Sequence, residues 1–220
     1  MHLTIISGAA RSQSKSNTAK IIGAFCKGFQ INENTTEIWY LSDRAQWDKA
    51  RNAFQNNKDI LFALPLYVEN VPGIMLEFLQ SLSYKTEPGT KLSFLVQGGF
   101  PEASQSRCCE NFLKTLPDKL GCEYGGTFIR GDMFGVGLLG DKLGAKMVAP
   151  FIDIGRLFAR YGYFNTEIIS RFASSEYLSK KQIWQCEKLG KYIQKWFMDW
   201  IAKRIGCKEK LDAKPYERIH

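Results

Sequence analysis

The feature that most constrains the fold of this chain is the alternation of short apolar runs with amphipathic stretches. Five runs are rich in β-branched or aromatic residues and have the length of strands: residues 3–6, 36–41, 60–64, 92–96 and 127–130. Between them, apolar residues recur at helical spacing: Ile21, Ile22, Phe25 and Phe29; Trp47, Ala50 and Phe54; Ile74, Met75, Phe78, Leu79 and Leu82; and Phe112, Leu113 and Leu116. Strands that alternate with helices imply right-handed crossovers and a parallel sheet covered on both faces.

The predicted fold class is therefore α/β, a three-layer sandwich around a five-stranded parallel sheet. Because all five strands come early and only helices follow, the strand order 2-1-3-4-5 is favoured over a six-stranded dinucleotide-binding order. At 220 residues the chain is long enough for one sizeable core. We predict a single domain over residues 1–220, with a core over about 1–165 and a C-terminal helical extension over about 178–206.

The region after the fifth strand is predicted to be a glycine-rich connection, residues 131–144, followed by extra helices. Apolar positions between 151 and 158 indicate one helix, and Pro150 suits its first turn. Residues 181–205 have the pattern of a long terminal helix with one apolar side. Gly206 fits the C-terminal stop of that helix.

Cysteine and histidine usage argues against several classes of site. The chain has six cysteines and no CxxC pair, which predicts reduced thiols and no metal site. Its two histidines, His2 and His220, lie at the termini, so a Ser-His-Asp hydrolase or a Cys-His protease has no well-placed base. We interpret the adjacent Cys108 and Cys109 as helix-packing residues, with a redox role as the alternative.

The start of the chain lacks the basic region, the sustained apolar run and the cleavage site of a signal peptide. The longest apolar run, residues 60–68, contains Pro65 and is far shorter than the roughly 20 residues of a membrane-spanning helix. Together with the reduced thiols, this predicts a cytoplasmic protein without a transmembrane segment.

The formal net charge of +8 is concentrated near the C-terminus. Residues 180–210 contain nine Lys and Arg against three Asp and Glu, which is +6 of the total. Because the rest of the chain is close to neutral, we expect no nucleic-acid partner. We interpret the terminal helix as a solvated basic face with its tryptophans packed on the body or on a second subunit. Contact with an anionic membrane surface is the alternative.

In a doubly wound sheet, ligands bind outside the carboxyl ends of the strands where the winding reverses. The loop after the first strand, residues 7–18, is rich in hydroxyls and opens a helix. The first turn of a helix has unpaired N–H groups and a partial positive charge, and Ser16, Asn17 and Thr18 can cap it or donate to an anion. Arg11 adds a charge-assisted contact. This loop is a candidate phosphate site, and an ordinary capped surface loop is the alternative.

The loop after the third strand, residues 65–73, has apolar and aromatic residues where a polar turn is usual. Pro65, Leu66, Tyr67 and Val68 can hold a flat ring there, and packing on a second subunit is the alternative.

The loop after the fourth strand contains the adjacent glycines Gly98 and Gly99, followed by Phe100. Glycines permit close approach of backbone N–H groups to a ligand, such as the polar edge of a flavin. Taken alone, however, Gly-Gly is an ordinary turn.

Together these loops resemble those of the flavodoxin-like NAD(P)H-dependent FMN reductases, a family that includes quinone and nitro-compound reductases. The family's first loop typically reads G-S-P-R and then G/S-N-T, and here it stands as Gly8-Ala9-Ala10-Arg11 and Ser16-Asn17-Thr18. Pro65-Leu66-Tyr67 is similar to the P-L-Y segment that lies against the isoalloxazine ring in relatives, and Gly99-Phe100-Pro101-Glu102 is similar to a G-F-P-E pattern. The sequence departs from the family at Ala9 and Ala10, which lose a serine hydroxyl and a proline.

The resemblance covers residues 1–130 and implies a flavodoxin-like sheet that binds FMN. It implies hydride transfer from NAD(P)H through FMN to a quinone, nitroaromatic or similar small acceptor, and a homodimer. The implied cofactor-binding residues are Arg11, Ser16, Asn17, Thr18, Pro65, Leu66, Tyr67, Val68, Gly98, Gly99 and Phe100. Because the cofactor carries the chemistry, few catalytic side chains are needed, and Tyr67 and Glu102 are the candidates.

Two further interpretations stay open. A non-catalytic flavin electron carrier or redox-sensing module is the alternative function, although such carriers are usually acidic and shorter. Residues 135–140 match the dinucleotide pattern GxGxxG, but no strand directly precedes them and no convincing strand follows. We interpret this stretch as a flap near the flavin pocket or a plain connection.

Overall fold

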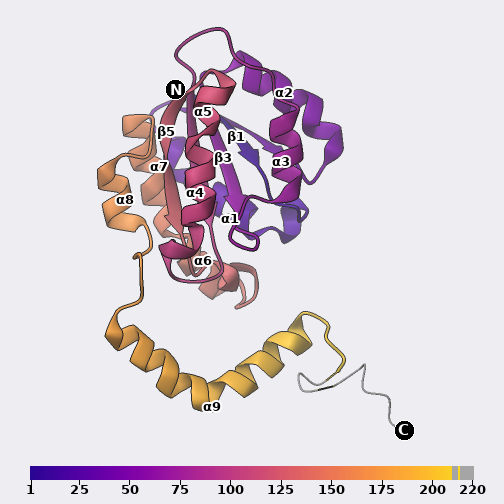
Figure 1. The fold of residues 1–220 in the computed structure, drawn as a ribbon, viewed down its shortest axis with the longest axis vertical. Coiled ribbons are helices and arrows are strands. Elements are labelled where there is room, and N and C mark those ends of the chain that lie inside the picture. Colours follow the sequence, from indigo (N-terminus) through magenta and orange to yellow (C-terminus); the bar gives the residue numbers. More distant parts are fainter. Residues whose placement is uncertain (210–212, 214–220) are drawn as a thin grey trace. The chain divides into compact units, whose positions relative to one another are not determined.

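A computed structural model describes residues 1–209 and 213 (Figure 1). One parallel sheet has the strand order β2-β1-β3-β4-β5. Its strands are β1 (His2–Ser7), β2 (Thr35–Tyr40), β3 (Asp59–Pro65), β4 (Lys91–Gln97) and β5 (Glu123–Arg130). The five predicted strands and their predicted order are confirmed.

Helices cover both faces of the sheet, so the predicted three layers are confirmed (Figure 1). One face packs on α1 (Asn17–Phe29) and α7 (Pro150–Tyr161), and the other on α2 (Trp47–Asn56), α3 (Gly73–Gln80), α4 (Arg107–Lys114) and α5 (Leu116–Leu120). Side chains of β1 alternate between the layers, with Leu3 and Ile5 in the first core and Ile6 in the second.

Helix α1 is held against α7 at very short range by two glycines. A Cβ at Gly28 would lie 1.8 Å from the carbonyl oxygen of Ile152, and a Cβ at Gly155 would lie 2.0 Å from that of Phe25. Only glycine permits backbones to approach this closely. The close contact fixes α1, and with it the position of the helix N-terminus at the carboxyl edge of the sheet.

The helices after β5 are α6 (Asp141–Val148), α7, α8 (Thr166–Phe172) and α9 (Lys180–Arg204). Elsewhere along the described chain lie the 3₁₀ turns η1 (Gln13–Lys15), η2 (Arg44–Gln46), η3 (Ala103–Ser106) and η4 (Phe134–Gly137). Pro150 occupies the first turn of α7, as predicted. Ser179 and Gln182 form a capping box at the start of α9, and Gly206 follows its end at a φ of 92°. Helices α6 and α8 were not predicted.

Contacts divide the chain into two compact units, Met1–Tyr177 and Leu178–His220. The expectation of a single domain stays a prediction. The first unit holds the whole sheet and every loop that the sequence singles out as a ligand site. Within the part of the chain that the structure describes, no helix combines the length and the apolar character needed to cross a membrane.

Candidate functional site

The three candidate loops lie side by side at the carboxyl edge of the sheet, because β1, β3 and β4 are neighbours. The chain leaves β1 toward β2 on one side, and β3 lies on the other, so the winding reverses here. Backbone hydrogen bonds join the loops: Gly8 N–H donates to Ala63 O at 2.9 Å, and Leu66 N–H donates to Gln97 O at 2.7 Å. The structure thus brings the sequence-predicted segments together.

The loop after β1 ends at the N-terminus of the 13-residue helix α1, where Ser16 is the N-cap. Its hydroxyl accepts a hydrogen bond from Ala19 N–H at 3.2 Å. Among the described residues, nothing accepts from the N–H groups of Asn17 and Thr18. These two groups and the helix dipole make an anion-binding end. Arg11 is exposed on the same loop.

The side chain of Asn17 has a structural role that the sequence did not reveal. Its Nδ2 donates to the carbonyl oxygens of Met133 at 3.0 Å and Phe134 at 3.4 Å, which ties η4 to the start of α1. Gly137 lies so close that a Cβ there would be 2.6 Å from Asn17 Oδ1. Asn17 therefore offers its backbone N–H to a ligand, while its amide group holds η4.

Two buried hydroxyls lie beneath the same loop. Thr18 is 1% exposed, and its Oγ1 accepts a long hydrogen bond of 3.4 Å from Gln97 Nε2, which links α1 to the end of β4. Ser7, the last residue of β1, is also 1% exposed. Ser7 Oγ and Trp39 Nε1 are the buried side-chain polar atoms that lack a hydrogen-bond partner within the described residues. A buried polar group without a partner is rare in folded proteins, and a bound ligand, ion or water is one explanation for it.

The loop after β3 projects a strained apolar turn. Tyr67 and Asn70 exchange backbone hydrogen bonds of 3.0 and 3.1 Å, and the two residues between them, Val68 and Glu69, have φ values of 47° and 61°. Positive φ is rare for a β-branched residue and stores strain, which clusters at ligand sites. Val68 is 98% exposed and Tyr67 41% exposed. Pro65 is the buried last residue of β3, and the half-buried Leu66 packs against the core.

Backbone hydrogen bonds join the loop after β4 to the end of β5 and the segment that follows it. Gly98 N–H donates to Arg130 O at 2.9 Å, and Gly98 O accepts from Met133 N–H at 2.9 Å. The Gly98 N–H is thus already paired. The Gly99 N–H has no acceptor among the described residues. Phe100 is 70% exposed beside it. Glu102 is half-buried directly before η3.

The glycine-rich stretch 135–140 is packed into the molecule. It begins within η4, where Val136 is 1% exposed in the core, and ends at Gly140, the N-cap of α6. A Cβ at Gly99 would lie 3.7 Å from Phe134, so η4 borders the candidate site. Helices α6 and α7 follow it, and no strand pairs with it, so it is not a second dinucleotide fold.

The cysteines divide into buried and exposed thiols. Burial raises the pKa of Cys109 to about 12 and that of Cys122 to about 11, so both are protonated at neutral pH. Cys108 is exposed. Within the described residues, no group of three His, Cys, Asp or Glu side chains could hold a metal ion.

A separate polar hollow of about 760 Å³ lies along β2, with Trp39, Tyr40 and Lys49 among its lining residues. Burial raises the pKa of the Tyr40 hydroxyl there. Gln13 of the first loop also lines the hollow.

Comparison with known proteins supports the fold and not a family assignment by sequence. No protein-family model matches the chain, and no curated protein matches it. Among solved structures, an NAD(P)H:quinone oxidoreductase from Methanothermobacter marburgensis is 15% identical with a TM-score of 0.55, covering 73% of this chain and 96% of its own. The chain has the flavodoxin-like fold.

Two further structures with this fold are similar over most of their length. An FMN-dependent NADH-azoreductase from Bacillus anthracis, solved with FMN, is 14% identical with a TM-score of 0.53, covering 74% of this chain and 99% of its own. An NADH:FMN oxidoreductase in its apo form is 17% identical with a TM-score of 0.54, covering 82% and 98%.

The residues at the edge fit a flavin phosphate and ring. Within the described residues, the N–H groups of Asn17 and Thr18 have no acceptor and suit a phosphate, and the buried Ser7 hydroxyl has no hydrogen-bond partner. The apolar turn at Val68 and the free Gly99 N–H suit a flat ring with one polar edge.

Proposed function

We propose that this chain is an FMN-dependent NAD(P)H oxidoreductase that reduces a quinone, a nitroaromatic or a similar small acceptor. The observation that carries the proposal is that three loops meet where the winding of the sheet reverses. Within the described residues, the first backbone N–H groups of α1 have no acceptor, and the turn after β3 exposes Tyr67 and Val68. That arrangement matches what a phosphate joined to a flat ring requires. The similar solved structures include an FMN-dependent NADH-azoreductase and an NAD(P)H:quinone oxidoreductase.

The phosphate end of the site is assigned to the first loop. The N–H groups of Asn17 and Thr18 would donate to phosphate oxygens, and the guanidinium of Arg11 would supply a charge. Ser16 acts by capping the helix that presents these donors. Ala9 and Ala10 offer no hydroxyl to the phosphate. The backbone N–H groups would therefore contribute a larger share of phosphate binding here than in family members that have Ser-Pro at these positions.

The ring end of the site is assigned to the other two loops. Pro65, Leu66, Tyr67 and Val68 would border one side of the ring, and the Gly99 N–H would donate to its polar edge. Gly98 contributes by fixing the loop to β5 through its paired N–H and carbonyl. Phe100 and Phe134, 70% and 54% exposed, would form an apolar rim for a planar acceptor.

When bound, FMN supplies the chemistry by accepting a hydride from NAD(P)H and passing electrons to the acceptor. The chain's own residues bind, orient and exclude water. Tyr67 and Glu102 remain the candidates for a proton donor, because both lie on the loops that border the ring. Other side chains at this edge act through position and charge alone.

The decisive test is steady-state oxidation of NADH and NADPH by FMN-loaded protein with a quinone acceptor. We expect turnover that depends on both FMN and the acceptor. Tight FMN binding without turnover from either donor would instead indicate an electron carrier and would reject the enzyme. We further propose a homodimer and a cytoplasmic location, which sedimentation and cell fractionation would check.

A further inference from the structure

An extended segment after α8 joins two of the site's loops from outside. We call residues 173–176 the strap. On one side, Ser174 N–H donates to Ile129 O at 3.2 Å and Ser174 Oγ accepts from Gly131 N–H at 2.9 Å. On the other side, Ala103 N–H donates to Ser175 O at 2.9 Å and Ser104 N–H donates to Glu176 O at 3.2 Å. The strap therefore bridges the end of β5 and the turn η3 that follows the β4 loop.

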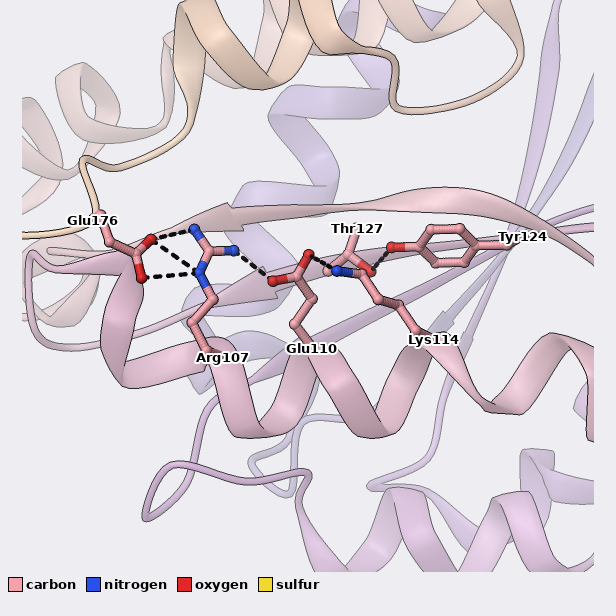
Figure 2. Close-up of polar contacts among 6 residues, drawn as sticks. All are labelled: Arg107, Glu110, Lys114, Tyr124, Thr127 and Glu176. Carbon is pink, nitrogen blue, oxygen red and sulfur yellow. Dashed lines mark hydrogen bonds and ion pairs between the residues drawn. The ribbon is translucent and has the colours of Figure 1, made fainter.

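The strap is anchored by a bidentate ion pair at its end (Figure 2). Arg107, the first residue of α4, donates from Nε to Glu176 Oε1 at 3.2 Å and Oε2 at 2.9 Å, and from Nη2 to Oε2 at 2.5 Å. Its Nη1 donates to Glu110 Oε2 at 2.5 Å, and Glu110 Oε1 lies 2.9 Å from Lys114 Nζ. Both acids are thereby satisfied, and Arg107 is held between them in one orientation.

The two loops that the strap joins are already in direct contact. Asp132 N–H donates to Phe100 O at 3.0 Å. A Cβ at Gly131 would lie 2.2 Å from the same oxygen, so the backbones touch with no space between them. Any movement of residues 129–131 must therefore move Phe100 and the neighbouring Gly99.

We propose that Arg107 and Glu176 are positioning residues of the site, holding the strap so that the Gly99 N–H and Phe100 stay in place against the flavin ring. This inference rests on the proposed FMN function. The ion pair touches neither ligand nor reacting atoms and acts through the strap and the β4 loop. Its loss would loosen the ring end of the site while leaving the phosphate end on α1 intact, because the close contact at Gly28 and Gly155 holds α1 against α7.

The test compares Arg107→Gln and Glu176→Gln with two controls. Arg156→Gln removes an exposed ion pair on α7, between Arg156 and Asp153, that includes no residue of the strap or of its ion-pair network. Lys114→Gln removes the far end of the network and leaves the pair between Arg107 and Glu176 intact. Amide hydrogen exchange of the apo protein is measured over residues 98–106, together with the FMN dissociation constant and the flavin reduction potential.

We expect exchange over residues 98–106 to rise roughly tenfold in both Arg107→Gln and Glu176→Gln and in neither control. FMN affinity should fall roughly tenfold, since a small misplacement is costly, and the reduction potential should shift because the ring's polar edge loses a fixed donor. Arg107→Lys keeps the charge but not the bidentate geometry, so it should give a smaller change in the same direction.

If folded Arg107→Gln and Glu176→Gln show unchanged amide exchange, FMN affinity and flavin reduction potential, the positioning role is overturned and the FMN proposal stands. Failure of the unaltered chain to bind FMN would instead overturn the proposed function, and the positioning role with it. The two failures are therefore distinguishable.

Discussion

The two edges of the sheet treat polar groups in opposite ways. At the amino edge, Lys85 is 6% exposed, and its Nζ donates to the carbonyl oxygens of Phe54 at 2.6 Å, Gln55 at 3.0 Å and Asn57 at 2.7 Å. All three ammonium donors are used, and the last carbonyls of α2 are capped. At the carboxyl edge, Ser7 Oγ is buried with no hydrogen-bond partner among the described residues, and none of these residues accepts from the N–H groups of Asn17 and Thr18.

This difference separates the part of the molecule that stabilises it from the part that binds. A closed polar network stabilises a fold because every buried group has a partner. An edge with unpaired donors and a strained turn contributes less to the stability of the fold than a fully paired edge would. The unpaired donors gain partners when a ligand binds. The carboxyl edge is therefore expected to tolerate loss of a polar group that the amino edge does not.

The largest effect is expected for Lys85→Met. The substitution leaves three carbonyl oxygens without a donor, which should lower the free energy of unfolding by about 3 kcal/mol. Urea denaturation measures it, with Lys119→Met, at an exposed position, as the control. A loss as small as that of the control would show that the amino edge is not closed by Lys85.

A matched serine pair sharpens the comparison. Ser93 Oγ donates to Gly125 O at 3.0 Å, so Ser93→Ala should lower the free energy of unfolding by about 1 kcal/mol. Ser7→Ala loses no hydrogen bond and should change it by less than about 0.5 kcal/mol. FMN affinity should fall in Ser7→Ala alone. Equal losses of stability in the two variants would contradict the unpaired state of Ser7.

The strain at the turn after β3 can be relieved. Asn tolerates positive φ better than a β-branched residue does, so Val68→Asn should raise the free energy of unfolding by up to about 1 kcal/mol. Glu69→Asn should act in the same direction by less, because Glu is not β-branched. Thermal denaturation of both variants checks this, and a destabilised Val68→Asn would argue against strain in the turn.

The smallest effect concerns thiol reactivity. With its pKa raised to about 12, Cys109 has a thiolate fraction of about one in ten thousand at pH 8, and Cys122, with a pKa of about 11, has a fraction of about one in a thousand. Iodoacetamide at pH 8 should therefore label the exposed Cys108 well before either. Peptide mass spectrometry follows the labelling, and rapid modification of Cys109 would contradict its packing role.

Sequence patterns predicted the sheet well because buried strands and helices that pack on both faces leave strong apolar periodicity. Helices α6 and α8 escaped because each buries little, with Gly144 and Ile168 as their buried residues. A single buried position leaves no periodicity to detect.

The candidate site was predicted to the level of loops and not of atoms. The loops after β1, β3 and β4 do meet, but the amide of Asn17 holds η4 and the N–H of Gly98 pairs with Arg130. These partners are distant in sequence, so no local pattern announces them. The strap was missed for the same reason. Ser7 was also missed as a site residue, although a polar residue at the end of an apolar strand was a signal that the sequence offered.

The most direct test of the carboxyl edge as an FMN site is a titration of the apo protein with FMN and with riboflavin, followed by quenching of flavin fluorescence. The two ligands share the ring and differ in the phosphate. The N–H groups at the start of α1, with Arg11, should make FMN bind roughly tenfold or more tightly than riboflavin. Equal affinities, or no quenching by either ligand, would contradict the account.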